Sequence, residues 1–148
     1  MYKQILVPVD GSQTSLAAVH HAVELAKAFK SSLFIVHVID IYPFLGVGAD
    51  YAVGQAEYLQ AATANANGAL NAAQEIASAA GVDCESATVE GHAAEEGILN
   101  TADTCDADLI VIGSHGRRGI EKLLLGSVTQ RVLQDARVPV MVVRGTNA

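Results

Sequence analysis

Basic residues and long apolar runs are both scarce in this sequence, and each shortage argues against a class of function. Nine Lys and Arg stand against sixteen Asp and Glu, which gives a formal net charge of −7 over 148 residues. Nonspecific nucleic-acid binding requires a basic surface, so this balance argues against it. No apolar run approaches the roughly 20 residues of a membrane-spanning helix, so no membrane partner is expected.

Cysteine is also rare. The two that are present, Cys84 and Cys105, match no metal-binding or redox spacing, and two reduced thiols are typical of a cytosolic protein. The chain enters an apolar segment at Ile5 without the pattern of a cleavable leader before it. Both observations predict a cytoplasmic protein.

Three familiar site motifs are missing. No Gly-x4-Gly-Lys-[Ser/Thr] sequence occurs, which excludes a P-loop lysine. The turn after the first apolar segment reads Asp10-Gly11-Ser12-Gln13, so the dinucleotide fingerprint Gly-x-Gly-x-x-Gly is absent there. His92-Ala93-Ala94-Glu95 is not a zinc pattern, and the acids Glu95 and Glu96 suit the start of a helix.

The composition is that of an ordered globular protein, with 51% hydrophobic and 17% charged residues. The length predicts one domain over residues 1–148. Apolar runs predict strands at 5–9, 33–39, 84–90, 109–112 and 139–143, and helical periodicity lies between them at about 16–29, 59–80, 94–105 and 128–136. Pro43 and the glycines between about 40 and 55 indicate a loop.

Alternating strands and helices predict an α/β fold, a doubly wound parallel sheet of five strands with helices on both faces. Segments 5–9 and 109–112 are uniformly apolar, as central strands are, and 84–90 alternates weakly, as an edge strand does. Ligands of such sheets bind beyond the carboxyl ends of the strands, where the strand order reverses. If the two central strands are neighbours, Asp10 and the loop after Ile112 face each other there.

The most informative segment follows the fourth expected strand. It reads Gly113-Ser114-His115-Gly116, then nine residues, then Gly126-Ser127-Val128-Thr129 at the start of an expected helix. Glycines let phosphate oxygens approach the backbone, and a helix start supplies unpaired N–H groups and the positive end of a dipole. The segment, called the glycine loop below, therefore predicts a phosphate site. Plain turn chemistry is the competing interpretation.

Polar residues beside this loop have two interpretations each. Asp10 is either a ligand-binding acid or a turn former, and His115 is either a phosphate donor or a solvated loop residue. Arg117, Arg118 and Lys122 either neutralise phosphates or are surface charges.

These segments together resemble one family. Val7-Pro8-Val9-Asp10-Gly11-Ser12, His37-Val38, the glycine loop and the closing Pro139-Val140-Met141-Val142-Val143 are similar to the universal stress proteins along the whole chain. The loop matches that family's nucleotide-binding pattern, Gly-x2-Gly-x9-Gly-[Ser/Thr]. The resemblance implies the strand order 3-2-1-4-5, ATP as ligand, with magnesium as an option, and usually a homodimer.

Site residues carry over from the resemblance one by one. Asp10 would serve the ribose or a magnesium ion, and the backbone at Val38 and Ile112 would frame the adenine. The segment 41–58 carries nothing over. The implied binding residues are Pro8, Val9, Asp10, Val38, Ile112, Gly113, His115, Gly116, Gly126, Ser127, Val128 and Thr129.

We therefore expect a cytoplasmic, ATP-binding regulatory protein of the stress response. A slow ATPase or autophosphorylating enzyme is the second hypothesis, although only His115 is a candidate general base and no acidic pair marks a two-metal site. A nucleotide-free interaction module is the third. A homodimer is expected through the fifth strand, Pro139-Val140-Met141-Val142-Val143, because an unprotected apolar edge strand favours pairing with a second copy. Cover within its own chain is the alternative.

Overall fold

The fold is a single parallel sheet with helices on both faces, and the computed structural model describes residues 1–40, 50–91, 93–115 and 125–145. The strands are β1 (Gln4–Pro8), β2 (Ser32–Asp40), β3 (Cys84–Gly91), β4 (Leu109–Gly113) and β5 (Val140–Val143). The helices are α1 (Gln13–Phe29), α2 (Asp50–Ala79), α3 (Ala94–Thr104) and α4 (Ser127–Asp135). The strand order β3-β2-β1-β4-β5 confirms the predicted fold class and topology.

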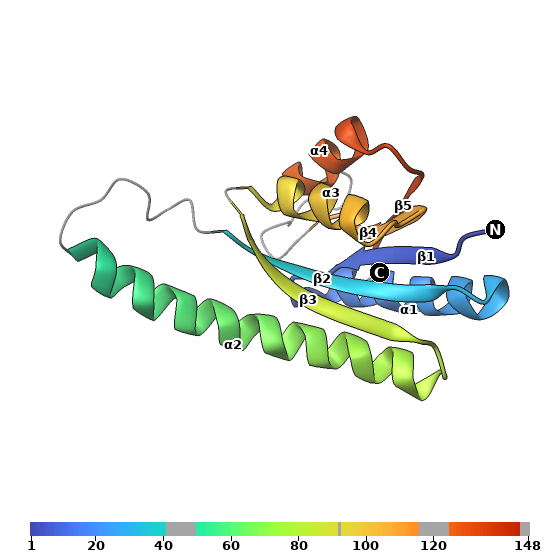
Figure 1. Cartoon of the computed structure of the whole chain (residues 1–148), viewed down its shortest axis with the longest axis horizontal. Helices are drawn as coiled ribbons and strands as arrows, with labels where there is room; N and C mark the ends of the chain where they lie inside the picture. Colours follow the sequence, from blue (N-terminus) through green and yellow to red (C-terminus); the bar gives the residue numbers. More distant parts are fainter. Residues whose placement is uncertain (41–49, 92, 116–124, 146–148) are drawn as a thin grey trace.

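The two strands with uniformly apolar sequences occupy the centre of the sheet, as predicted. β1 pairs with β2 on one side and with β4 on the other, where Ile5 aligns with Leu109. Side chains alternate between two core layers. Ile5 and Val7 pack in the layer against α1 and α2, and Leu6 and Ile110 pack in the layer against α3 and α4. The two pairs of helices cover opposite faces of the sheet (Figure 1). Each such side chain, fully buried, contributes about 1.5–3 kcal/mol.

Helix ends follow the local signals in the sequence. Ser12 caps α1, and its Oγ accepts a hydrogen bond from the N–H of Ser15 at 3.2 Å. α2 is followed by Gly81, whose φ is +73°. The Gly81 N–H donates to the Ser78 carbonyl and the Val82 N–H donates to the Ala77 carbonyl, both at 3.0 Å. This pair of bonds is a Schellman motif, which favours glycine at the left-handed position.

One sequence prediction was wrong at the start of α2. Residues 50–55 were expected to lie in a loop, but α2 begins at Asp50 and runs through Gly54. A glycine inside a helix costs only about 1 kcal/mol, and the residues after it favour a helix. The remainder of that expected loop, 41–49, lies outside the described residues. α2 is longer than the sheet it covers, and its amino-terminal part extends past the end of β2 (Figure 1).

Within the described part of the chain, no helix has both the length and the apolar character needed to cross a membrane.

Candidate functional site

A cavity of about 660 Å³ lies at the carboxyl ends of β1, β2 and β4. The strand order reverses between β1 and β4, which is where doubly wound sheets bind their ligands. The walls also include the starts of α1, α3 and α4. Eleven residues that were named for the site from the sequence line this cavity: Pro8, Val9, Asp10, Val38, Ile112, Gly113, His115, Gly126, Ser127, Val128 and Thr129. The twelfth, Gly116, lies outside the described residues, as do Arg117, Arg118 and Lys122.

Sequence reasoning missed part of the wall. The further lining residues are Ser12, Ser15, Val36, Ala93, Ala94, Glu95, Ile98 and Arg131. Val36 lies two residues before Val38, so the two-residue period of a strand places both side chains on one face and was a usable signal. The contribution of α3 had no such signal, because it depends on how closely this helix packs against β2.

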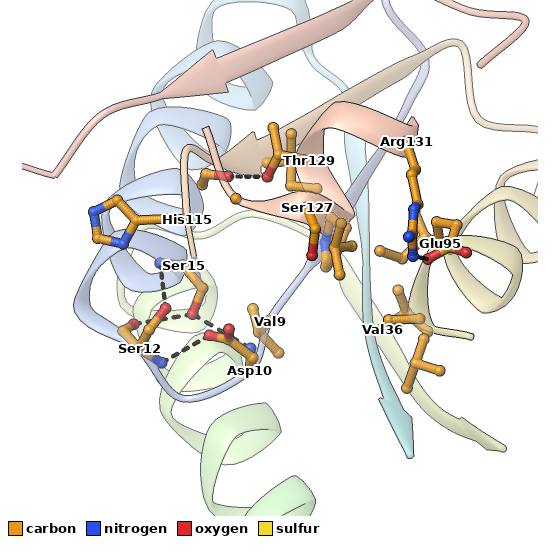
Figure 2. Close-up of a pocket in the computed structure, with 18 of the residues that line it drawn as sticks. Val9, Asp10, Ser12, Ser15, Val36, Glu95, His115, Ser127, Thr129 and Arg131 are labelled. Carbon is orange, nitrogen blue, oxygen red and sulfur yellow. Dashed lines mark hydrogen bonds and ion pairs between the residues drawn. The ribbon is translucent and has the colours of Figure 1, made fainter. Parts of the chain in front are cut away.

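The turn after β1 is built around Asp10. One carboxylate oxygen, Oδ1, accepts a hydrogen bond from the N–H of Ser12 at 2.9 Å. Ser15 Oγ accepts a bond from the Asp10 N–H at 3.4 Å and donates to the Ser12 carbonyl at 3.0 Å (Figure 2). Asp10 therefore forms this turn. This role does not exclude a ligand, because Oδ2 accepts no hydrogen bond from the described residues.

The first part of the glycine loop has three successive carbonyls, and each accepts a hydrogen bond from a residue distant in the sequence. The Gly113 carbonyl accepts from Thr129 Oγ1 at 2.8 Å. The Ser114 carbonyl accepts from the Gly126 N–H at 2.8 Å. The His115 carbonyl accepts from the hydroxyl of Thr14. These bonds occupy the negative ends of the peptide dipoles, which would otherwise repel an anion in the cavity.

The start of α4 presents the opposite polarity to the same cavity. Gly126 is the N-cap, and no described side chain caps the helix. The first hydrogen bond within the helix runs from the Gln130 N–H to the Gly126 carbonyl at 3.0 Å. The N–H groups of the three residues between them therefore have no carbonyl partner within the helix. Those residues, Ser127, Val128 and Thr129, all line the cavity, so the positive end of the α4 dipole faces it.

Gly126 and Ser127 present different groups to the cavity. The Gly126 N–H is already used by the Ser114 carbonyl, so it is not a donor to a ligand in this conformation. Ser127 is the first residue of α4 and does not cap it. Its hydroxyl therefore remains a donor on the cavity wall (Figure 2).

The other part of the cavity is apolar. Val36 and Val38 from β2, Ile98 from α3 and Ile112 from β4 contribute hydrocarbon surface to it. α3 approaches β2 very closely here, because a Cβ atom placed on Gly97 would lie 2.8 Å from both methyl groups of Val38. A narrow, apolar wall of this kind suits a flat ring.

Charged side chains also span the cavity wall between α3 and α4. Arg131 Nη1 lies 3.6 Å from Glu95 Oε1, and the Glu95 side chain is 15% exposed against 59% for Arg131. This pair lies across the cavity from Asp10 (Figure 2). Among the described residues, no group of three or more His, Cys, Asp or Glu side chains is arranged to hold a metal ion.

The cysteines lie away from the cavity lining and stay protonated. Burial, with a smaller contribution from Glu85, raises the pKa of Cys84 to about 11. Burial also raises the pKa of Cys105. Neither thiol therefore has the lowered pKa of a reactive nucleophile.

Comparison with known proteins extends the sequence resemblance. The model of the universal stress protein family matches residues 1–144. The universal stress protein MJ0531 of Methanocaldococcus jannaschii is 38% identical over 145 residues, which cover 97% of this chain and 83% of that protein.

Solved structures agree with this match. The hypothetical protein MJ0577 has a TM-score of 0.83 and 30% identity, with 100% of this chain and 99% of that chain covered. A universal stress protein in complex with cAMP has a TM-score of 0.68 and 31% identity, with 98% of each chain covered. The universal stress protein of Archaeoglobus fulgidus in complex with dAMP has a TM-score of 0.66 and 26% identity, with 96% of this chain and 98% of that chain covered.

Proposed function

This chain belongs to the universal stress protein family, and we propose that its cavity binds ATP or a related adenine nucleotide. The observation that carries the proposal is the polarity of the cavity wall. The carbonyls of residues 113–115 each accept a hydrogen bond, while the N–H groups of the first three residues of α4 have no acceptor among the described residues. The relatives in complex with cAMP and dAMP support an adenine base and a phosphate as the common parts of the ligand.

Each part of the nucleotide has a matching region of the wall. The phosphates lie at the start of α4, where the N–H groups of Ser127 and Val128 and the Ser127 hydroxyl donate to their oxygens. The adenine ring lies against the apolar wall, framed by Val38 and Ile112. Asp10 Oδ2 accepts from the ribose or contacts a magnesium ion. A single carboxylate fits such an ion, because magnesium keeps several waters and takes its other ligands from the phosphates.

The nucleotide in this proposal regulates the protein, by changing its conformation or its choice of partner, as part of a cytoplasmic stress response. The two cysteines are free thiols, which is consistent with a reducing compartment. His115 is the candidate general base on the described wall. The other carboxylate of the described lining, Glu95, lies across the cavity from Asp10 and pairs with Arg131. This arrangement favours binding over dedicated hydrolysis.

A homodimer through β5 is a further part of the proposal. β5 is an edge strand. The Ile110 N–H donates to the Pro139 carbonyl at 3.0 Å, and the Ser114 N–H donates to the Val143 carbonyl at 2.8 Å. Because backbone groups alternate in direction along a strand, those of Val140 and Val142 point to the open edge, and a second copy can pair with them.

Replacement of Gly126 by Val tests the site. Gly126 has φ −64° and ψ 156°, which a valine adopts, so the fold should survive. The branched side chain fills space at the start of α4, and we expect the affinity for ATP to fall at least about tenfold, or ~1.4 kcal/mol. Calorimetric titration measures it. Gly68→Val is the matched control, because an added Cβ there meets no atom within 4 Å.

Native mass spectrometry of the purified protein identifies a nucleotide that is carried through purification. A time course of ADP release then separates regulatory binding from slow hydrolysis. Unchanged ATP affinity in a folded Gly126→Val protein would place the phosphates elsewhere. A wild-type protein that binds no adenine nucleotide would leave the interaction module as the remaining hypothesis.

A further inference from the structure

Thr14 lies in the first turn of α1, directly behind the cavity wall, and is not itself part of the lining. The residue is buried, with 4% of its surface exposed. Its hydroxyl donates to the carbonyl of His115, which is 101 residues later in the chain. Thr14 also packs tightly against the end of β4, because a Cβ atom on Gly113 would lie 3.0 Å from the Thr14 carbonyl oxygen. Thr14 is therefore the contact between α1 and the glycine loop.

The same hydroxyl continues into the turn around Asp10. Thr14 Oγ1 lies 3.3 Å from Ser12 Oγ, and the Ser12 N–H donates to Asp10 Oδ1 at 2.9 Å. A path of hydrogen bonds thus runs from Asp10 through Ser12 and Thr14 to the His115 carbonyl. Asp10, Ser12 and His115 all line the cavity (Figure 2). The path joins the wall proposed for the ribose to the loop proposed for the phosphates.

We propose that Thr14 is a positioning residue that keeps residues 113–115 of the glycine loop in an anion-binding conformation by holding the His115 carbonyl toward α1. This inference rests on the proposed function of the cavity. A carbonyl oxygen carries partial negative charge and repels phosphate oxygens, so a loop that is free to turn this carbonyl into the cavity binds phosphate less well. The carbonyls of Gly113 and Ser114 keep their own donors, which confines the effect to one peptide group.

The test compares two ligands that differ only in their phosphates, ATP and adenosine, by calorimetric titration. Thr14→Val removes the hydroxyl and keeps the branched shape, and we expect ATP affinity to fall about tenfold, as for the loss of one hydrogen bond. Adenosine affinity should stay within about twofold, because the base and ribose do not contact the loop carbonyl. Thr14→Ser restores the donor and should restore ATP binding.

Two further variants separate positioning from folding. Thr14→Ala removes the hydroxyl without adding a methyl group beside the carbonyl, and it replaces Thr14→Val if that protein does not fold. Ser31→Ala is the matched control, because Ser31 is also buried and its hydroxyl donates to the Tyr2 carbonyl at the opposite end of the sheet. We expect Ser31→Ala to bind both ligands as the wild type does.

Each outcome decides between the claims. If the wild-type protein binds neither ATP nor adenosine, the proposed function is wrong and this inference falls with it. If the wild-type protein binds ATP and both Thr14→Val and Thr14→Ala bind it with the same affinity, this inference alone is wrong. An equal loss of ATP and adenosine would reduce Thr14 to a structural role, and so would a Thr14→Ser protein that binds ATP no better than Thr14→Val.

Discussion

Gly97 lies close to Val38, and we predict that Gly97→Ala destabilises the protein when residue 38 is valine and stabilises it when residue 38 is alanine. A methyl group on Gly97 would lie 2.8 Å from both Val38 methyl carbons, well inside van der Waals contact. Either α3 moves away from β2 or Val38 moves, and overpacking of this kind typically costs about 1–3 kcal/mol. Alanine is also a better helix former than glycine by about 1 kcal/mol. The net effect of Gly97→Ala is a loss of stability of about 1 kcal/mol, or roughly 3 °C in Tm.

Removal of the Val38 methyl groups reverses that sign. In a Val38→Ala protein the nearest remaining atom is the Cβ of residue 38, 3.4 Å from the new methyl group. The steric clash is then absent and only the higher helix propensity of alanine remains. Gly97→Ala should therefore stabilise the Val38→Ala protein by up to about 1 kcal/mol. The coupling energy between the two sites is therefore about 2 kcal/mol.

Urea unfolding of the wild type, both single variants and the double variant measures this coupling. The same four proteins titrated with ATP relate the contact to the cavity, because Val38 is part of its apolar wall. We expect Gly97→Ala to weaken ATP binding when Val38 is present and to have less effect when it is absent. Equal stability changes for Gly97→Ala in both backgrounds would refute the reasoning, because they would show that α3 accommodates the methyl group without involving Val38.

Two other predictions concern Asp10 and β5. Asp10→Ala should weaken ATP binding. Loss of magnesium dependence in calorimetric titrations of this variant would assign Asp10 to the metal rather than to the ribose. Unchanged ATP affinity with and without magnesium would show that Asp10 only forms the turn. Val142→Pro removes an N–H that points to the open edge, so light scattering at micromolar concentration should show loss of the dimer with little change in Tm. Met141→Pro instead removes a hydrogen bond to β4 and should lower Tm. A monomeric wild-type protein, or a dimer that persists in Val142→Pro, would contradict pairing through β5.

The sequence carried enough information to place Asp10 and the glycine loop together before any coordinates. Segments 5–9 and 109–112 are uniformly apolar, which marked them as central strands. Their adjacency was a condition of that prediction, and the pairing of β1 with β4 meets it. Parallel strands end at one edge of a sheet, so the residues after their last positions had to meet. The helical periodicity that ends near residue 80 likewise gave the end of α2 correctly, and Gly81 follows it in a left-handed conformation that glycine adopts without strain.

Features that arise from packing between distant elements had no equivalent signal. Gly97 was one glycine among thirteen, and its significance depends on the separation of α3 and β2. The contributions of Glu95 and Arg131 to the cavity wall depend on the same packing, because the two residues lie on different helices. The start of α2 was misplaced for a different reason, since Gly54 was interpreted as a loop residue although a single glycine is only a weak helix breaker.

The glycine loop itself shows where a sequence pattern stops being informative. Glycines explain why a phosphate oxygen can approach the backbone, but they leave open which backbone groups face it. For residues 113–115 that direction depends on three donors: the hydroxyl of Thr14 in α1, and the N–H of Gly126 and the hydroxyl of Thr129 at the far end of the loop. A threonine in the sequence does not reveal this role, because threonine hydroxyls also form local hydrogen bonds. The Thr101 hydroxyl, for example, donates to the Gly97 carbonyl within α3. A phosphate loop is therefore recognised in a sequence by its glycines, whereas the direction of its carbonyls is decided by donors that only the fold brings into contact with them.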